Sequence, residues 1–109
     1  MSYGGTNNQD AYDWNYRANR LKRSGNLEGA FEGYKKALAY DPLFVAPWVN
    51  MGLLLGGLGQ FEDAERAIST GLEIEPDNPF ALGSMAALIL HDTDRQKEAE
   101  SLLQKALEK

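Results

Sequence analysis

The segment Trp48–Phe61, WVNMGLLLGGLGQF, has the apolar content of a buried helix, yet four of its fourteen residues are glycine. Glycine in a helix interior costs about 1 kcal/mol relative to alanine. The glycines therefore need a structural reason, such as the close approach of two helices or a turn with a positive φ angle. The rest of the sequence supplies that reason, because the segment belongs to a repeat.

The chain repeats with a period of 34 residues. The aligned pairs include Trp14 with Trp48, Ala30 with Ala64, and Pro42 with Pro76. A second step of 34 places Met85 on Met51, so a third unit begins near Pro79. Helix-breaking residues lie in the middle of the first two units, at 24–26 and 59–60. Each unit is therefore predicted to be two helices joined by a turn.

This pattern resembles the tetratricopeptide repeat family, whose 34-residue unit carries Trp, Leu, Gly, Tyr, Ala, Phe and Pro at set positions. The resemblance covers residues 11–109. It implies an all-α fold, a right-handed α-solenoid of three helix-turn-helix repeats. The expected organisation is a flexible N-terminal tail (1–10), repeat 1 (11–44), repeat 2 (45–78) and repeat 3 (79–109), which ends without the closing proline. Asp10 is the predicted N-cap of the first helix.

The repeat accounts for most of the glycines. Gly52 aligns with two alanines, Ala18 and Ala86, so it is predicted to lie where two helices approach closely. Gly59 lies at a predicted turn, where a positive φ angle favours glycine. Gly56 and Gly57 leave two alternatives open. Either the first helix of repeat 2 ends early, or bare backbone lets a partner approach the helix.

Composition argues against several classes of protein. The chain has no cysteine, and therefore no disulfide or zinc–thiolate site. No run of 18 apolar residues is present, so direct membrane insertion is not expected. The N-terminus lacks the basic start and apolar stretch of a secretory signal. These features together favour a cytoplasmic location.

The charge argues against nucleic-acid binding. The net charge is −5, whereas nonspecific binding to nucleic acid depends on clustered Lys and Arg side chains. The basic run in the first predicted helix consists of Arg17, Arg20, Lys22 and Arg23, and it is predicted to spread around the helix at about 100° per residue rather than form one stripe.

The sequence contains no arrangement that indicates catalysis. Its one histidine, His91, lies at a predicted turn near Asp92 and Asp94, a setting typical of a solvated side chain. Its acidic clusters lack the glycine-containing loop of a calcium site. We therefore predict that the protein is not an enzyme and binds no metal or cofactor.

The family resemblance implies that the first helix of each repeat lines a concave, peptide-binding groove. The partner-binding residues that it implies are Tyr12, Asn15, Tyr16, Asn19, Val49, Asn50, Leu53, Phe80, Ser84, Ala87 and His91. One subfamily holds the C-terminal carboxylate of heat-shock chaperones with a clamp of Lys, Asn, Asn, Lys and Arg. Asn19 and Asn50 match its asparagines, but Asn15, Phe80 and Ser84 stand at the places of its cations. Charge-assisted hydrogen bonds are lost with those cations.

The predicted function is that of a protein–protein interaction module, a scaffold or adaptor that binds a peptide or helix of a partner in the groove. Two alternatives stay open. A self-associating structural module, and hence a homo-oligomer, would use an exposed apolar patch of Val49, Leu53, Phe80 and Leu90. A fragment of a longer protein would regulate a larger enzyme or membrane assembly.

Overall fold

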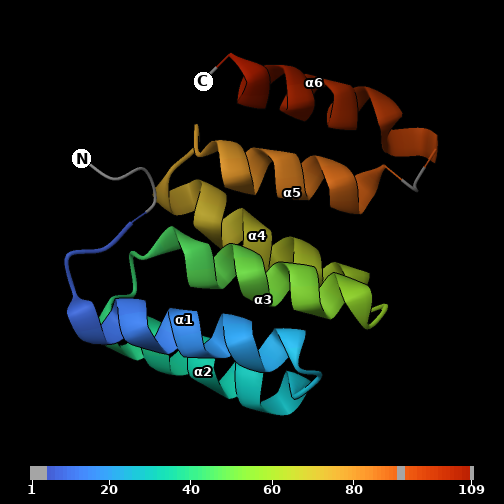
Figure 1. Ribbon diagram of the computed structural model, residues 1–109. Coiled ribbons are helices and arrows are strands. Elements are labelled where there is room, and N and C mark those ends of the chain that lie inside the picture. Colours follow the sequence, from blue (N-terminus) through green and yellow to red (C-terminus); the bar gives the residue numbers. More distant parts are fainter. Residues whose placement is uncertain (1–4, 91–92, 109) are drawn as a thin grey trace.

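The computed structural model describes residues 5–90 and 93–108. In this part of the chain, every secondary-structure element is a helix and there is no strand, so the predicted all-α fold is confirmed (Figure 1). The helices are α1 (Gln9–Arg23), α2 (Leu27–Tyr40), α3 (Val45–Gly57), α4 (Phe61–Ile74), α5 (Pro79–Ile89), the short 3₁₀ helix η1 (Thr93–Arg95) and α6 (Gln96–Leu107).

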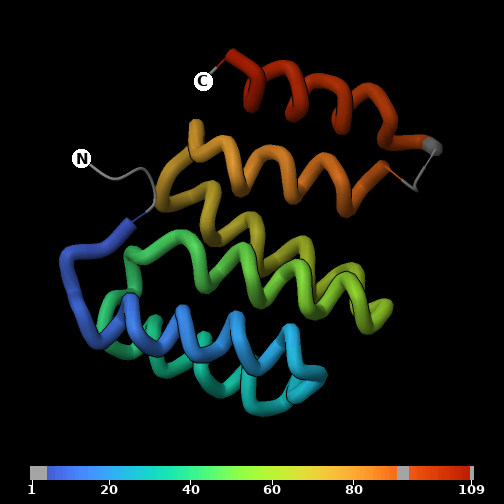
Figure 2. Tube along the Cα trace, in the orientation of Figure 1, coloured from blue at the N-terminus to red at the C-terminus, as the bar shows by residue number. Residues whose placement is uncertain are grey.

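The helices stack as three pairs, α1 with α2, α3 with α4 and α5 with α6, each pair lying against the next. Figure 2 traces this progression from the blue helix α1 to the red helix α6. The first helices of neighbouring pairs also touch, because α3 contacts both α1 and α5. The shortest dimension of the molecule is 19 Å, close to two helix diameters. The stack is therefore a two-layered solenoid.

Buried side chains join each pair to its neighbour. One cluster combines Ala18, Ala30 and Tyr34 of the first pair with Met51 and Leu54 of the second. A second cluster combines Ile68 of α4 with the last pair through Met85, Ala86, Ile89 and Ala99. The apolar surface of one pair is thus covered by the next, as expected for repeats that cannot bury it alone.

The glycines of the opening segment have the two structural roles predicted for them. Gly59 has a φ angle of 81°, and its equivalent Gly25 one of 90°. At Gly52, an added Cβ atom would lie 2.5 Å from Ile68 Cγ1 and 3.0 Å from the Ala64 carbonyl oxygen. Only a residue without a side chain lets α3 and α4 approach this closely.

Helix α3 continues through Gly57, the equivalent of the last residue of α1, so the prediction of an early helix end is wrong. An added Cβ at Gly56 would lie 3.1 Å from Leu88 Cδ1 of α5, whereas the space beside Gly57 is open. Of these two glycines, Gly57 is the one with unoccupied space beside its backbone.

The N-terminal segment differs from the predicted tail. Helix α1 begins at Gln9, and Asn8 is its N-cap because the Asn8 side chain accepts a hydrogen bond from the Ala11 amide at 3.0 Å. Asp10 lies in the first turn instead of capping the helix. The Thr6 hydroxyl donates a hydrogen bond to the Asp41 carboxylate, which ties this segment to the loop after α2. Residues 1–4 of the predicted tail lie outside the described residues.

An ion-pair network links the C-terminal pair to α4. Arg95 donates two hydrogen bonds to the Glu65 carboxylate, at 2.7 and 2.9 Å, and two to Glu98, at 2.9 and 3.0 Å. The hydrogen bonds from Arg95 lower the pKa of the Glu65 carboxyl group, and partial burial opposes them. Conversely, the hydrogen bonds to Glu65, and to a smaller extent those to Glu98, raise the pKa of Arg95.

Acid is expected to weaken this link. Because the pKa of Glu65 is lower in the folded state, its stabilising effect is complete above the ordinary value of 4.5 and is lost as the pH falls through the folded pKa. Urea unfolding should show Glu65→Gln to be about 0.5–1 kcal/mol less stable than wild type at neutral pH. That difference should shrink in acid, while the control Glu100→Gln stays near wild type at every pH. A difference that is independent of pH would contradict the prediction.

Candidate partner-binding face

The first helices of the three pairs together form one surface, which we name the α1/α3/α5 face. Residues spaced by 34 occupy equivalent places on these helices and form rows across them. The three rows are Tyr12, Ala46 and Phe80, then Asn19, Leu53 and Ala87, and finally Lys22, Gly56 and Leu90. Of these, Tyr12, Leu53, Phe80, Ala87 and Leu90 are exposed, and the others are half-buried. The face therefore presents mainly apolar and aromatic side chains.

Amide side chains lie among these apolar groups in fixed orientations. The Asn50 Nδ2 atom donates to Asn15 Oδ1 at 3.3 Å, which joins α3 to α1. The Tyr34 hydroxyl, reaching from α2, donates to Asn19 Oδ1 at 2.5 Å. These bonds leave the Asn19 Nδ2 group available, among the described residues, to donate to a bound peptide carbonyl.

The Tyr34 hydroxyl supports this arrangement from beneath. Burial raises the pKa of Tyr34 from 10.0 to about 12, and the positive charge of Arg23 opposes part of that rise. Because the folded pKa is raised, the stabilisation from the neutral hydroxyl is complete below pH 10.0 and is lost as the pH rises through about 12. Tyr34 therefore remains a hydrogen-bond donor to Asn19 across the neutral range.

Tyr34→Phe is expected to cost about 0.5–1.5 kcal/mol of stability, because the hydrogen bond to Asn19 is lost. In an ultraviolet absorbance titration, the phase near pH 12 should disappear from the variant. Tyr40→Phe serves as the control, since Tyr40 is about half exposed, and should leave that phase in place. Persistence of the high-pH phase in Tyr34→Phe would show that another tyrosine produces it.

Val49 is not part of the exposed face. It is 0% exposed and clusters with Val45 and Ala81, so its predicted place in the groove is wrong. An added Cβ at Gly71 would lie 3.3 Å from Val49 Cγ2, which shows that Val49 also packs toward α4. The residue turns inward between its helix and the following ones, where a partner cannot reach it.

Position on the helix explains the burial of other predicted residues. Asn50 and its equivalent Ser84 are each 8% exposed, because this position faces the preceding helix. Tyr16 holds the same position in α1 but is about half exposed, since no helix of the described chain lies on that side. Asn15 and Asn19 are half-buried, and His91 lies outside the described residues.

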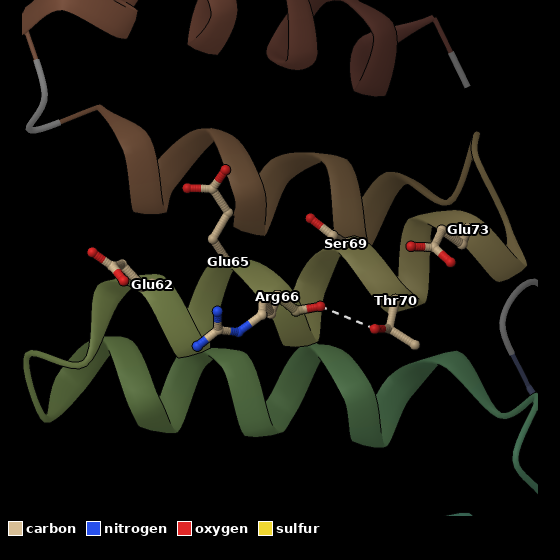
Figure 3. Close-up of a pocket in the computed structure, with 6 residues that line it drawn as sticks. All are labelled: Glu62, Glu65, Arg66, Ser69, Thr70 and Glu73. Atoms are coloured by element: carbon tan, nitrogen blue, oxygen red, sulfur yellow. Dashed lines mark hydrogen bonds between the residues drawn. The ribbon is translucent and has the colours of Figure 1, made fainter.

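Another hollow lies elsewhere, along the exposed side of α4 (Figure 3). It has a volume of about 530 Å³ and is lined by Glu62, Glu65, Arg66, Ser69, Thr70 and Glu73. Three of the six lining residues already have partners: Arg66 pairs with Asp63, Thr70 donates to the Arg66 carbonyl at 3.0 Å, and Glu65 binds Arg95. Within the described ranges, no group of three or more His, Cys, Asp or Glu side chains could hold a metal ion. This hollow is best understood as a solvated helix surface.

No helix in the described part of the chain combines the length and the apolar character needed to cross a lipid bilayer. The longest, α1, has 15 residues and carries several charged side chains.

The helix-pair architecture agrees with a match to a family model. The model described as "Tetratricopeptide repeat" matches residues 21–89, well over half of the chain. The chain belongs to the tetratricopeptide repeat family. The solved structures agree with this assignment. The first and second TPR domains of Spaghetti (RPAP3), each bound to the HSP90 peptide SRMEEVD, superpose on this tetratricopeptide repeat chain with TM-scores of 0.85 and 0.79.

Those two domains are 19% and 20% identical to the chain, so the likeness concerns the fold. The alignments cover 94% and 93% of this chain, and 83% and 93% of the respective domains. Among curated relatives, the protein O-mannosyl-transferase TMTC1 of Mus musculus is 29% identical over 72 residues, which cover 66% of this chain and 8% of the transferase. The uncharacterized protein MJ0572 of Methanocaldococcus jannaschii is 35% identical over 51 residues, or 47% of this chain and 59% of the relative. The repeats thus span only part of the length of both relatives.

Sequence reasoning missed two supports of the face. The Asn15–Asn50 hydrogen bond joins residues 35 apart, a separation that the 34-residue period places on neighbouring helices. That signal was available in the spacing. The hydrogen bond from Tyr34 to Asn19 depends on the depth of the second helix, which the repeat pattern alone does not give.

Proposed function

We propose that this tetratricopeptide repeat chain is a non-catalytic interaction module that binds a peptide or helix of a partner protein along the α1/α3/α5 face. The observation that carries the proposal is the set of exposed apolar side chains, Tyr12, Leu53, Phe80 and Leu90, spread over three neighbouring helices. Exposed apolar patches of this kind mark interaction sites.

The polar groups on this face suit a peptide backbone. Asn19 is half-buried and is held by Tyr34 in an orientation that leaves its Nδ2 group free to donate. Prepositioned amides reduce the ordering cost of binding. Large side chains such as Tyr12 and Phe80 supply the aromatic anchors that dominate interface energies. These groups favour a protein partner over a nucleic acid. The chain itself would act as a scaffold or adaptor.

The relatives of known structure support a peptide ligand without naming the one that binds here. The RPAP3 domains were solved with an HSP90 peptide. In this chain, Asn15, Phe80 and Ser84 stand where the resemblance places the cations of a carboxylate clamp. We therefore propose recognition through side chains and backbone of the partner segment, rather than through a terminal carboxylate.

A display selection tests the proposal. A library of random peptides fused to a display protein through their C-termini is selected on the immobilised wild-type chain. The enriched peptides are then titrated into isotopically labelled protein, and backbone amide shifts are followed by NMR. Shifts centred on Leu53, Asn19 and Phe80 are the expected result. A selection without enrichment, or shifts centred on α2, α4 and α6, would refute the proposal.

Self-association is the second candidate, because the same exposed apolar side chains could be buried against another copy of the chain. Sedimentation velocity over a range of concentrations separates the two functions. A homo-oligomer that forms without a partner, and that Leu53→Arg dissociates, would favour the second candidate. A third alternative follows from the match to 8% of TMTC1: the repeats would act as a regulatory module within a larger enzyme or membrane assembly.

A further inference from the structure

Three arginines gather on the outer side of α1, beside the α1/α3/α5 face. At about 100° per residue, Arg17, Arg20 and Arg23 fall within an arc of about 120°. The basic run was expected to spread around the helix. Only Lys22 lies outside this arc, and the three arginines share one side. Arg20 and Arg23 share this side with Tyr16, and the three line one hollow together with Ser24.

None of the three guanidinium groups lies within ion-pairing distance of a carboxylate of the described residues. Their contacts are with other groups: Arg17 stacks 5.0 Å from the Trp14 ring, Arg20 lies 6.0 Å from the Tyr16 ring, and Arg23 donates weakly to the Asn19 carbonyl at 3.5 Å. The ion pairs of the described chain lie on α2 and on α4 to α6. A protein of net charge −5 thus keeps three cations together with no paired carboxylate among the described residues.

The fold does not require these cations. The equivalents of Arg17 and Arg20 in α3 are Met51 and Leu54, which are buried against the preceding pair of helices. No helix of the described chain covers this side of α1, so its residues need only be polar enough to face solvent. Helices α3 and α5 also end without a basic residue in the last turn, so a favourable interaction with the helix dipole is dispensable here.

Helix α6, at the opposite end of the solenoid, provides a comparison because it also has a side that faces solvent. The exposed side of α6 mixes both signs with neutral residues, in Lys97, Glu100, Gln104 and Glu108. On the outer side of α1, Asp13 is followed by three arginines, and these are combined with the exposed ring of Tyr16. Solvation explains why α1 is polar on this side, but it does not explain why the three charged residues that follow Asp13 there are all positive.

The space beside the arginines can hold side chains. The hollow lined by Tyr16, Arg20, Arg23 and Ser24 has a volume of about 390 Å³. A second one, of about 440 Å³, is lined by Arg17, Arg20, Leu21 and Ser24. Arg20 and Ser24 belong to both, so the two hollows adjoin. Guanidinium groups bind carboxylates through two parallel hydrogen bonds, and an adjacent aromatic ring supports their orientation.

We propose that the arginine edge, Tyr16, Arg20 and Arg23 with Arg17, binds acidic side chains of the partner segment that occupies the α1/α3/α5 face. This inference rests on the proposed function and adds the partner's chemistry and direction. The segment carries apolar residues where it crosses Leu53 and Phe80, and Asp or Glu residues where it crosses the outer side of α1. The interaction is with side-chain carboxylates and not with a chain terminus.

The test is a second display selection, run in parallel on wild type, on Arg20→Glu/Arg23→Glu, and on the control Lys35→Glu/Lys97→Glu. Both variants change the net charge equally, and all four side chains are exposed. Circular dichroism and thermal melts establish that each variant is folded. Because the displayed peptides are fused through their C-termini, an acidic bias cannot come from a terminal carboxylate.

Wild type and control are expected to enrich peptides with acidic residues on one side of an apolar core, and Arg20→Glu/Arg23→Glu is expected to lose that bias or favour basic residues. A wild-type peptide should bind the variant at least about tenfold more weakly, and added salt should reduce that ratio. Enrichment of peptides without an acidic bias would overturn the inference but leave the proposed function intact. The absence of any enriched peptide would overturn both. Salt-sensitive self-association that depends on Arg20 and Arg23 would also overturn the inference, because the carboxylates would then come from a second copy.

Discussion

Replacing Ala64 with leucine is expected to lower the free energy of unfolding by about 1–3 kcal/mol, because the larger side chain overpacks a closed helix crossing. Ala64 is fully buried, and its carbonyl oxygen would lie 3.0 Å from a Cβ atom at Gly52. The helices α3 and α4 are thus already as close as this backbone allows. Three added carbon atoms can be accommodated only if the helices separate.

Ala30→Leu should have a similar effect, since Ala30 is also fully buried and packs in the cluster with Ala18 and Tyr34. Urea unfolding monitored by circular dichroism measures both changes. Ala39→Leu is the matched control, because Ala39 lies exposed on α2 and leucine is a good helix former. Midpoints of Ala30→Leu and Ala64→Leu that equal that of Ala39→Leu would show that these crossings are looser than the distances indicate.

Leu53→Arg is expected to weaken binding of a selected peptide by about 2 kcal/mol or more, the effect of losing an interface anchor. Leu53 is 37% exposed, so an arginine can direct its charged end to solvent with little loss of stability. The control is Leu103→Arg on α6, where leucine is 38% exposed but lies away from the α1/α3/α5 face. Titration calorimetry and thermal melts on both variants separate binding from folding.

Two results would contradict the prediction for Leu53→Arg. If Leu53→Arg lowers the melting temperature as strongly as Ala64→Leu does, Leu53 belongs to the core and the proposed site is misplaced. If both Leu53→Arg and Leu103→Arg bind the peptide as wild type does, the exposed apolar side chains of α1, α3 and α5 do not form the binding surface.

The fold could be predicted because the information for it is periodic. Gly52 aligns with Ala18 and Ala86, and this alignment of small residues reveals a close helix crossing before any coordinates are known. The positive φ angle at Gly59 follows from its place between two helical patterns. The start of α1 was less predictable, because Asn8 and Asp10 are both good caps. Asn8 is also tied to the end of α2, where its side chain donates to the Tyr40 carbonyl at 3.4 Å.

The binding face was predicted only in part, because exposure depends on where a helix sits in the stack. Tyr16, Asn50 and Ser84 are equivalent in sequence, yet only Tyr16 is exposed, since α3 and α5 each have a helix on the preceding side. Val49 turns toward the following helix and is lost from the surface. A repeat alignment treats these positions alike, whereas the first helix of a stack meets solvent on a side that later ones bury.

Helix α6 buries fewer side chains than the other α-helices of the stack. Ala99 is its one buried side chain in the described chain, and its packing partners are chiefly α5 and, through Arg95, Glu65 of α4. Little apolar burial offsets the conformational entropy that its 12 residues lose on folding. Local opening of α6 therefore requires less free energy than global unfolding, and its amide hydrogens should exchange with solvent well before those of α3. The solenoid is thus a molecule of graded rigidity, firm at its centre and fluctuating at its C-terminal helix on the timescale of hydrogen exchange.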